Sequence, residues 1–210
     1  SAYNAAFRRA GVIRAETSEE MFDWARALAW CPPPRGRCVA VLTNAGGPGI
    51  VATDMTVSSG LQLAGFKAET IEALKSHLPS AANVHNPVDV IGDAAQDRYE
   101  NALSAVIRDE GVDGALVILT PQSMTNALAT AEAIARIARR THKPIICCFM
   151  GVIDVSAGAK YLQNHGIPVY RFPENAAKAM GALYRYARWL NRPFFAPLPF
   201  SHDVSRARGL

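Results

Sequence analysis

Short apolar runs alternate with longer amphipathic segments through most of the chain. Three runs are too short for core-crossing helices and fit buried strands: CVAVLT at 38–43, GALVILT at 114–120 and PIICCFM at 144–150. In other segments apolar residues recur at helical intervals, which predicts helices over residues 49–63, 96–109, 126–139, 155–164 and 174–190. A further short strand is expected at 168–171.

This alternation predicts an α/β domain with a doubly wound sheet. Strands separated by helices of this length form right-handed βαβ units, in which the strands run parallel. We therefore expect about five parallel strands with helices on both faces. Ligands of such sheets bind beyond the carboxyl ends of the strands, so the loops that follow the strands are the places to search for a site.

The two ends of the chain differ from this core. Residues 2–10 are alanine-rich and apolar at helical intervals, and Thr17 with Glu20 forms a capping box that opens a second helix through Ala29. Three consecutive prolines within 31–37 predict a stiff connector. Past residue 190 the periodicity is lost, which predicts a linker and a chain cut from something longer. We therefore expect three units along the chain: residues 1–36 (two helices and connector), 37–190 (core domain) and 191–210 (proline-rich tail).

Composition is typical of a folded protein of the cytoplasm. Half of the 210 residues are hydrophobic, 19% are charged and the mean hydropathy is +0.04, which suits a large buried interior. No apolar run approaches the roughly 20 residues that span a bilayer, and no signal pattern opens the chain, so we expect no membrane partner. Cys147 and Cys148 are neighbours that point to opposite faces of a strand, and reduced thiols are expected.

The net charge of +4 is unevenly distributed, with −3 in residues 1–110 and +7 in residues 111–210. Much of the surplus lies at helical spacing in Arg136, Arg139, Arg140, Lys143, Arg185 and Arg188. No aromatic residues are interleaved as on a nucleic-acid surface, so no nucleic-acid partner is expected. Solvated helix faces or contact with an acidic neighbour account for these cations.

The strongest candidate for a site is TNAGGPGIVATD at 43–54, because it follows the first strand and opens an apolar helix. Gly46 and Gly47 allow positive φ and close backbone approach, and Pro48 suits the first helical position. The free N–H groups of residues 49–51 and the positive end of the helix dipole would then face an anion. The segment is neither a Walker loop nor a GxGxxG fingerprint. From the residues alone, an anion site and a ligand-free tight turn both remain open.

Two other loops carry secondary candidates. In NPVDVIG at 86–92, Asn86 sets a turn before Pro87, and Asp89 either binds a ligand or forms an Asx-turn or helix cap. Gln122 follows the next long strand and either contacts a ligand or simply starts the next helix.

The sequence predicts no catalytic residue and no metal site of its own. The histidines lack neighbouring metal partners and are assigned surface or capping roles: His77, His85, His142, His165 and His202. There is no GxSxG elbow and no CxxC pair. An anion site without a nucleophile or base suggests half of a composite site.

Five segments together resemble the second, carboxy-terminal flavodoxin-like domain of the ligase module in NDP-forming acyl-CoA synthetases, which include the ADP-forming acetyl-CoA synthetases and are related to succinyl-CoA synthetase. The segments are AYNAAFRRAGVIR (2–14), TNAGGPGIVATD (43–54), NPVDVIGDA (86–94), GVDGALVILTPQSMT (111–125) and GIPVYRFPENAAKAM (166–180). They cover nearly the whole chain in the same order, and the resemblance favours the anion site over the ligand-free turn.

The resemblance implies a role in phosphoryl transfer. In this family acyl-CoA and phosphate give acyl phosphate, a histidine takes the phosphoryl group, and a grasp-type nucleotide domain passes it to ADP. Two helix N-termini hold the phosphohistidine electrostatically. One of them would here comprise Asn44, Ala45, Gly46, Gly47, Pro48, Gly49 and Ile50, with Asn86, Asp89 and Gln122 as secondary candidates.

The resemblance also implies partner domains. In related chains the reactive histidine lies in a Ser-His-Thr-Gly stretch just before the AYNAAF segment, and this sequence starts at Ser1, after it. We therefore expect CoA-binding, phosphohistidine-bearing and nucleotide-grasp domains on the same chain or a partner. Those domains would bind CoA, ATP or ADP and Mg²⁺, this domain alone would bind none of them, and the isolated chain would be inactive as a ligase.

A second hypothesis is a flavodoxin-like scaffold or regulatory module of a fused protein, such as a protein acetyltransferase, in which the glycine turn is purely structural. A flavin carrier is disfavoured, because TNAGGPG lacks a hydroxyl-rich phosphate loop.

Overall fold

A computed structural model describes residues 2–193, so residues 194–210, with His202 and most of the predicted tail, lie outside the described residues. The strands are β1 (Cys38–Thr43), β2 (Gln62–Leu63), β3 (Val88–Asp89), β4 (Gly114–Leu119), β5 (Ile145–Phe149) and β6 (Val169–Tyr170). The helices are α1 (Ala2–Ala10), α2 (Ser18–Trp30), α3 (Gly46–Ser58), α4 (Ala68–His77), α5 (Gln96–Arg108), α6 (Ala127–Ala138), α7 (Ser156–Asn164) and α8 (Pro173–Leu190).

The strands form one parallel sheet in the order β2-β1-β4-β5-β6, and β3 also pairs with β1. β2 pairs with the start of β1, in register at Cys38 and Val39, while β3 pairs with its end, at Leu42 and Thr43. The predicted doubly wound α/β fold is confirmed. The sheet has six strands instead of about five, because two two-residue strands share one edge of β1.

Side chains alternate between the two faces of the sheet, as the strand period of two requires. In β5, Cys147 belongs to the buried cluster on one face and Cys148 to the cluster on the other, which confirms the prediction for this pair. Both thiols are free, and burial raises the pKa of Cys148 to about 12, so neither is a reactive thiolate. The strands are buried on both faces, which is why they read as continuous apolar runs.

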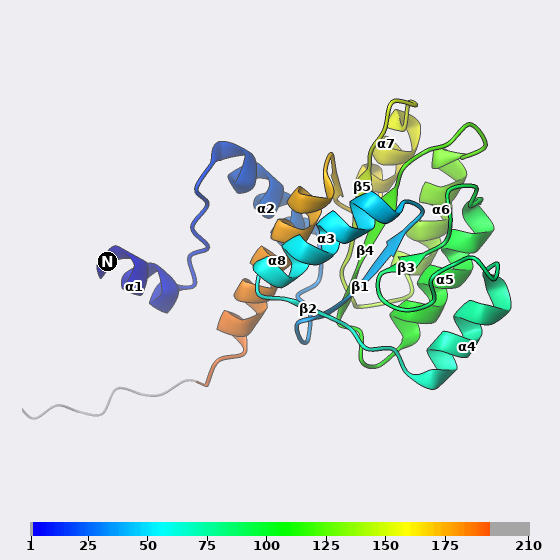
Figure 1. Ribbon diagram of the computed structural model, residues 1–210. Coiled ribbons are helices and arrows are strands. Elements are labelled where there is room, and N and C mark those ends of the chain that lie inside the picture. The colour runs from blue at the N-terminus through cyan, green and yellow to red at the C-terminus, as the bar shows by residue number, and fades with distance from the viewer. Residues whose placement is uncertain (1, 194–210) are drawn as a thin grey trace, which may run out of the picture.

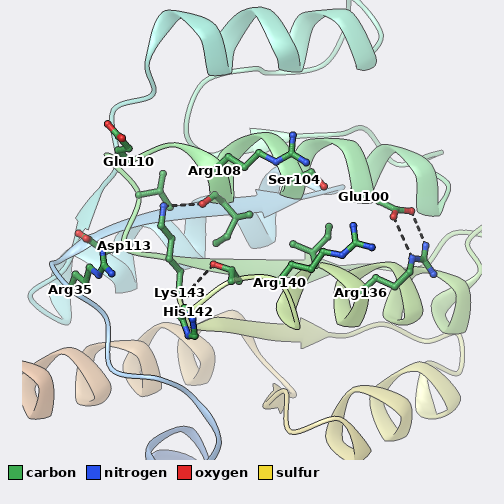
Figure 2. A pocket seen from close by; sticks show the side chains of 14 residues that line it. Arg35, Glu100, Ser104, Arg108, Glu110, Asp113, Arg136, Arg140, His142 and Lys143 are labelled. Atoms are coloured by element: carbon green, nitrogen blue, oxygen red, sulfur yellow. Dashed lines mark hydrogen bonds and ion pairs between the residues drawn. The ribbon is translucent and has the colours of Figure 1, made fainter.

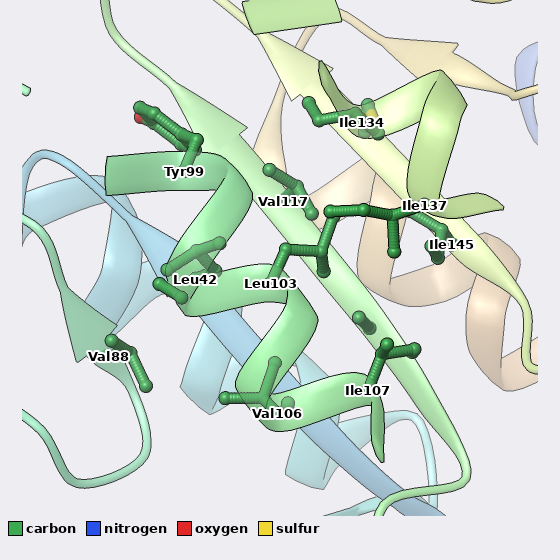
Figure 3. Close-up of a cluster of buried hydrophobic side chains, with 14 of the residues drawn as sticks. Leu42, Val88, Tyr99, Leu103, Val106, Ile107, Val117, Ile134, Ile137 and Ile145 are labelled. Atoms are coloured by element: carbon green, nitrogen blue, oxygen red, sulfur yellow. The ribbon is translucent and has the colours of Figure 1, made fainter. Parts of the chain in front are cut away.

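Helices cover both faces of the sheet (Figure 1). One face packs against α4, α5, α6 and α7, and its core includes Leu42, Tyr99 and Leu103 (Figure 3). The other face packs against α2, α3 and α8. Each fully buried leucine or isoleucine contributes about 1.5–3 kcal/mol relative to its exposed state, so both layers stabilise the sheet.

The two N-terminal helices have different relations to the core. The predicted capping box opens α2: the Thr17 hydroxyl accepts a hydrogen bond from the Glu20 N–H at 3.1 Å, and the Glu20 carboxylate accepts one from the Glu16 N–H at 3.0 Å. Trp24 and Ala27 of α2 are buried with α8, so this helix covers the sheet and is not a separate unit. α1 has no buried residue and lies beside the carboxyl end of α8 (Figure 1).

The helix predicted over 49–63 instead spans Gly46–Ser58. It ends at Ser59 and Gly60, and the φ of Gly60 is +83°, a conformation that glycine adopts without strain. The next residues then form β2, where the Gln62 N–H donates to the Arg37 carbonyl at 2.9 Å. A pairing partner distant in sequence therefore overrides the local helical pattern.

Candidate functional site

Three loops meet beyond the carboxyl ends of β1, β3 and β4. The side chain of Asn44 joins two of them, because its Nδ2 donates to the Thr120 carbonyl at 2.8 Å and its Oδ1 accepts from the Thr120 N–H at 2.9 Å. A Cβ atom at Gly92, in the third loop, would lie 3.8 Å from both the Asn44 carbonyl oxygen and Gln122 Cγ. The predicted edge of the sheet thus brings Asn44 and Gln122 together.

The amino end of α3 is the central feature of this edge. Its N-cap residue is Ala45, which is extended and offers no side-chain hydrogen bond to the helix. Thr43 instead bonds Ala45 itself, accepting from its N–H at 3.1 Å and donating to its carbonyl at 2.9 Å. Within residues 2–193 the N–H groups of Gly46 and Gly47 have no hydrogen-bond partner. Both therefore remain available to an acceptor from outside the chain.

This geometry corrects three details of the prediction. Positive φ does not occur at Gly46 or Gly47, because the helix already begins at Gly46. Pro48 is the third helical residue and not the first, a position where its missing N–H is equally harmless. The Gly49 N–H is occupied by the Ala45 carbonyl at 3.2 Å, so the free donors precede Pro48 and do not follow it.

Glycine occupies three positions of this turn, 46, 47 and 49, and the surroundings of the three positions differ. A Cβ atom at Gly49 would lie 2.8 Å from Thr43 Cγ2, so the close packing of α3 against the end of β1 requires glycine there. Gly46 and Gly47 are exposed, and a Cβ atom at either would meet nothing within 4 Å. The fold of this chain does not require glycine at these two positions. Their missing side chains leave the two N–H groups uncovered.

The side-chain amide of Asn86 is hydrogen-bonded to the sheet edge and is therefore not free to bind a ligand. Its Oδ1 accepts from the Val41 N–H at 2.9 Å, and its Nδ2 donates to the carbonyls of Val39 and Ala64 at 2.9 and 3.0 Å. The side-chain amide thus fills the gap between β2 and β3 along β1, next to the cis Asn86–Pro87 peptide bond. Its contribution to the site is to fix the position of the loop that follows.

Asp89 and Gln122 both lie at this edge, but of the two only the Asp89 side chain makes a hydrogen bond within the described chain. The Asp89 Oδ1 accepts from the Ile91 N–H at 2.9 Å, which is the predicted Asx-turn, and Ile91 has a φ of +70°. The Gln122 side chain is exposed, and its backbone N–H donates to Thr125 Oγ1 at 2.9 Å. Gln122 is thus the only one of the three secondary candidates whose side chain has no hydrogen bond in the described part of the chain.

Exposed apolar side chains follow the same strand ends, and sequence reasoning missed them. They are Ile50 after β1, Met124 after β4, Val152 after β5 and Phe172 after β6. Met124 is 81% exposed. Exposed apolar residues that share one edge of a domain are typical of contact surfaces. The sequence pattern could have shown that these residues follow strands, but it could not have shown that their side chains are exposed.

Titratable groups do not converge at this edge. In residues 2–193 no three His, Cys, Asp or Glu side chains are placed to hold a metal ion. His165 stacks on Tyr161 with ring centroids 4.2 Å apart, and His142 lies at the opposite edge of the sheet. Asp93 pairs with Arg98 at 2.5 Å, and this hydrogen bond lowers the pKa of the Asp93 carboxyl. The donors that this edge offers to a ligand are the backbone N–H groups of Gly46 and Gly47.

The comparisons with known proteins agree with this architecture. The family model of the Ligase-CoA domain matches residues 39–192. The chain belongs to the Ligase-CoA domain family. It is also 41% identical over 187 residues to the ADP-forming acetate–CoA ligase I of Archaeoglobus fulgidus, a match that covers 89% of this chain and 26% of that protein.

Other similar proteins also match most of this chain with only a part of their own length. The α subunit of ADP-forming acetate–CoA ligase I of Pyrococcus furiosus is 35% identical, with 89% of this chain and 41% of the subunit covered. The apo structure of dinucleotide forming acetyl-coenzyme A synthetase 1 of Ca. Korarchaeum cryptofilum superposes with a TM-score of 0.84 at 33% identity, covering 90% of this chain and 42% of that one. A structure of that synthetase in complex with phosphate and ADP gives the same TM-score.

The chain spans between a quarter and a half of the length of these relatives, all of which are larger ligases or ligase subunits. Over residues 2–193, none of the helices combines the length with the apolar character that a membrane crossing needs.

Proposed function

We propose that this Ligase-CoA domain takes part in an NDP-forming acyl-CoA synthetase, an acid–thiol ligase, by stabilising a phosphohistidine during phosphoryl transfer between acyl phosphate and ADP. The observation that carries the proposal is the amino end of α3, where the N–H groups of Gly46 and Gly47 have no partner in the described chain and no side chain covers them. The family membership and the phosphate-bound relative support the same role.

The proposed mechanism is electrostatic. The helix dipole places roughly half a positive charge at the amino end of α3, and the two N–H groups point along the helix axis toward an oxygen ligand. These donors are held by the helix itself, by the Thr43–Ala45 bonds and by the Asn44–Thr120 bonds. They therefore need no reorganisation when charge develops on the phosphoryl oxygens. No proton transfer by this domain is part of the proposal.

The histidine itself would come from another domain. The exposed apolar residues Ile50, Met124, Val152 and Phe172 surround the same sheet edge and suit a surface that an adjacent domain covers. CoA, the nucleotide and Mg²⁺ would be held by the CoA-binding and nucleotide-grasp domains, on the same chain or a partner chain. The P. furiosus relative is an α subunit, which fits such a division.

A domain-exchange chimera tests the proposal. The matching region of the A. fulgidus ligase is replaced by this chain, and acetyl-CoA formation from acetate, CoA and ATP is measured. We expect an active chimera in which Gly47→Glu lowers the turnover by about a hundredfold, because a carboxylate at the helix end repels the phosphoryl group. Glutamate in the first turn is favourable to the helix, so folding should be preserved.

Two control substitutions separate charge from bulk. Gly47→Gln adds the same volume without the charge and should lower turnover much less. Gly65→Glu adds the same charge at another exposed glycine with open space around it, and should leave turnover unchanged. A chimera that assembles and makes no acetyl-CoA, or a Gly47→Glu chimera as active as the unsubstituted one, would contradict the proposal. The second result would favour a scaffold module.

A further inference from the structure

A pocket lies at the opposite edge of the sheet. It has a volume of about 470 Å³ and opens between α5 and α6, near the amino ends of β4 and β5 (Figure 2). Its polar lining includes Arg35, Ser104, Arg108, Arg140, His142 and Lys143. Some of the surplus basic residues in the carboxyl half of the sequence therefore line this pocket.

Two of the cations at this pocket have clear structural roles. Arg136 pairs with Glu100, with Nη2 to Oε2 at 2.8 Å. Lys143 Nζ donates to the carbonyls of Ile107 and Asp109 at 2.8 and 2.6 Å and so caps the carboxyl end of α5. Cations are favoured at helix carboxyl ends, and Lys143 already fills that role for α5.

The acidic side chains of the lining are also engaged. Glu100 takes the Arg136 pair, and Glu110 bonds Lys67 at 2.6 Å, outside the pocket lining. The Asp113 Oδ2 accepts from the Cys38 N–H at 2.8 Å. Each of the three carboxylates therefore already has a partner.

Three guanidinium groups remain without a partner. The side chains of Arg35, Arg108 and Arg140 make no hydrogen bond or ion pair with any residue of the described chain. Figure 2 shows Arg108 on α5 and Arg140 after α6 at the groove between these helices, with Ser104 nearby. Burial lowers the pKa of the neighbouring Lys143 ammonium, and repulsion by Arg35 adds to this effect, while Asp109 and Asp113 oppose it.

The floor of the pocket is apolar. Ile107, Val112 and Ile137 contribute to the lining, and all three are buried. Pockets of about 300–1,000 Å³ that combine apolar walls with a few polar groups are typical of small organic ligands. The pocket is therefore large enough for a ligand with an apolar or aromatic part beside its charged groups.

We propose that this pocket binds a small organic phosphate that carries at least two phosphoryl charges, with its apolar part on the floor between α5 and α6. Arginine forks bind phosphate oxygens in pairs of hydrogen bonds, and Arg108 and Arg140, which lie at the same groove, can neutralise two phosphoryl charges. The site is separate from the amino end of α3, since the two lie at opposite edges of a parallel sheet. Its occupation does not depend on the proposed role in phosphoryl transfer.

The test uses the ¹⁵N-labelled chain, with ADP in the absence of Mg²⁺, pyrophosphate and adenosine as probes. We expect ADP to move the backbone amide resonances of Ser104, Arg108 and Lys143 in a saturable way. Pyrophosphate should move the same resonances with lower affinity, because it lacks an apolar part, and adenosine should move none of them. Pyrophosphate binding as tight as that of ADP would show that the floor is not used and would overturn the organic part of the proposal.

Substitutions locate the site. Arg108→Gln and Arg140→Gln should each weaken ADP binding about tenfold, since each removes a charged hydrogen-bond donor. Arg139→Gln is the matched control, because Arg139 is exposed beside Arg140 but does not line this pocket. Unchanged affinity in both pocket variants, an equal loss in the control, or no response at the pocket amides would overturn the proposal. Shifts confined to Gly46 and Gly47 would also overturn it, while supporting the function proposed for α3.

Discussion

The side chain of Asn86 takes the place of a backbone segment at the sheet edge. β2 and β3 pair with the two ends of β1, and the amide of Asn86 bonds the backbone between them at Val39 and Val41. A third hydrogen bond, to the Ala64 carbonyl, ties it to the end of β2. One residue therefore joins three segments of chain that lie far apart in sequence.

We predict that Asn86→Ala lowers the free energy of unfolding by about 3 kcal/mol, because it removes three hydrogen bonds and leaves the Val41 N–H and the Ala64 carbonyl without partners. Urea unfolding followed by circular dichroism measures the change. Gln122→Ala is the control, since that side chain is exposed and unbonded, and it should cost less than about 0.5 kcal/mol. Equal effects of the two substitutions would show that the amide bonds of Asn86 contribute nothing.

Asp109 makes the stability of the folded chain depend on pH. Its buried carboxylate accepts hydrogen bonds from the Lys67 N–H, the Thr70 hydroxyl and the Gly111 N–H at 2.7–2.9 Å. Burial alone would raise the pKa of Asp109, but these hydrogen bonds outweigh it and the pKa lies below its ordinary value of 3.8.

Because the pKa is lower in the folded chain, the stabilisation by Asp109 is fully present above the ordinary value of 3.8 and is lost as the pH falls through the folded value. We predict that Asp109→Asn is less stable than the unsubstituted chain near neutral pH. The difference should shrink as the pH falls from neutral to 3.8 and below. Urea unfolding of both proteins across this range checks it, and a difference independent of pH would be inconsistent with this role.

The sequence identified the polar residues of the site loops but not their partners. Asn44 and Thr120 are 76 positions apart and bond each other, so Asn44 braces two loops and does not face a ligand. Asp89 fits its predicted Asx-turn, because that turn is formed by a local bond to Ile91. Local bonds are readable from a sequence, whereas long-range bonds depend on the assembled fold.

At the scale of elements, α3 has no side-chain cap at its amino end, a feature that it shares with α4, α5, α7 and α8. By contrast, α2 and α6 are capped by Thr17 and Asn126, whose side chains accept from backbone N–H groups. An uncapped helix leaves donors unsatisfied, which costs stability that a cap commonly supplies. At α3 the N–H groups of Gly46 and Gly47 are also uncovered by side chains, which is consistent with an end that receives its acceptor from outside the chain.

The glycines of α3 give an element-scale prediction. Gly49→Ala should lower the free energy of unfolding by about 1–3 kcal/mol, because the added methyl group would lie 2.8 Å from Thr43 Cγ2. Gly46→Ala adds a methyl group in open space at a helical position and should keep or slightly raise the stability. Thermal unfolding compares them. A destabilised Gly46→Ala variant would show that the fold itself requires that glycine.

The long strands followed from the sequence, and so did β6, whereas β2, β3 and the helix α4 did not. β1, β4 and β5 are five or six residues long and buried on both faces, so continuous apolar runs revealed them. β2 and β3 have two residues each and exist because β1 offers an open edge. Two residues carry no periodicity, so only the assembled sheet defines such strands.

At the scale of the whole molecule, the parallel sheet separates two kinds of surface. The edge at the carboxyl ends of the strands has the free helix end of α3 and exposed apolar side chains. The edge at the amino ends has the arginine-lined pocket between α5 and α6 (Figure 2). Parallel strands place all loops of one kind at the same edge, which is why segments distant in sequence share a surface.

The most direct test of the central claim is a titration of the ¹⁵N-labelled chain with inorganic phosphate. The account predicts that the backbone amide resonances of Gly46 and Gly47 move in a saturable way. Gly47→Glu should abolish the shift at Gly46, and Gly65→Glu should preserve the shifts at both positions. Resonances of Gly46 and Gly47 that stay in place as phosphate is added would contradict the claim that this helix end binds a phosphoryl group.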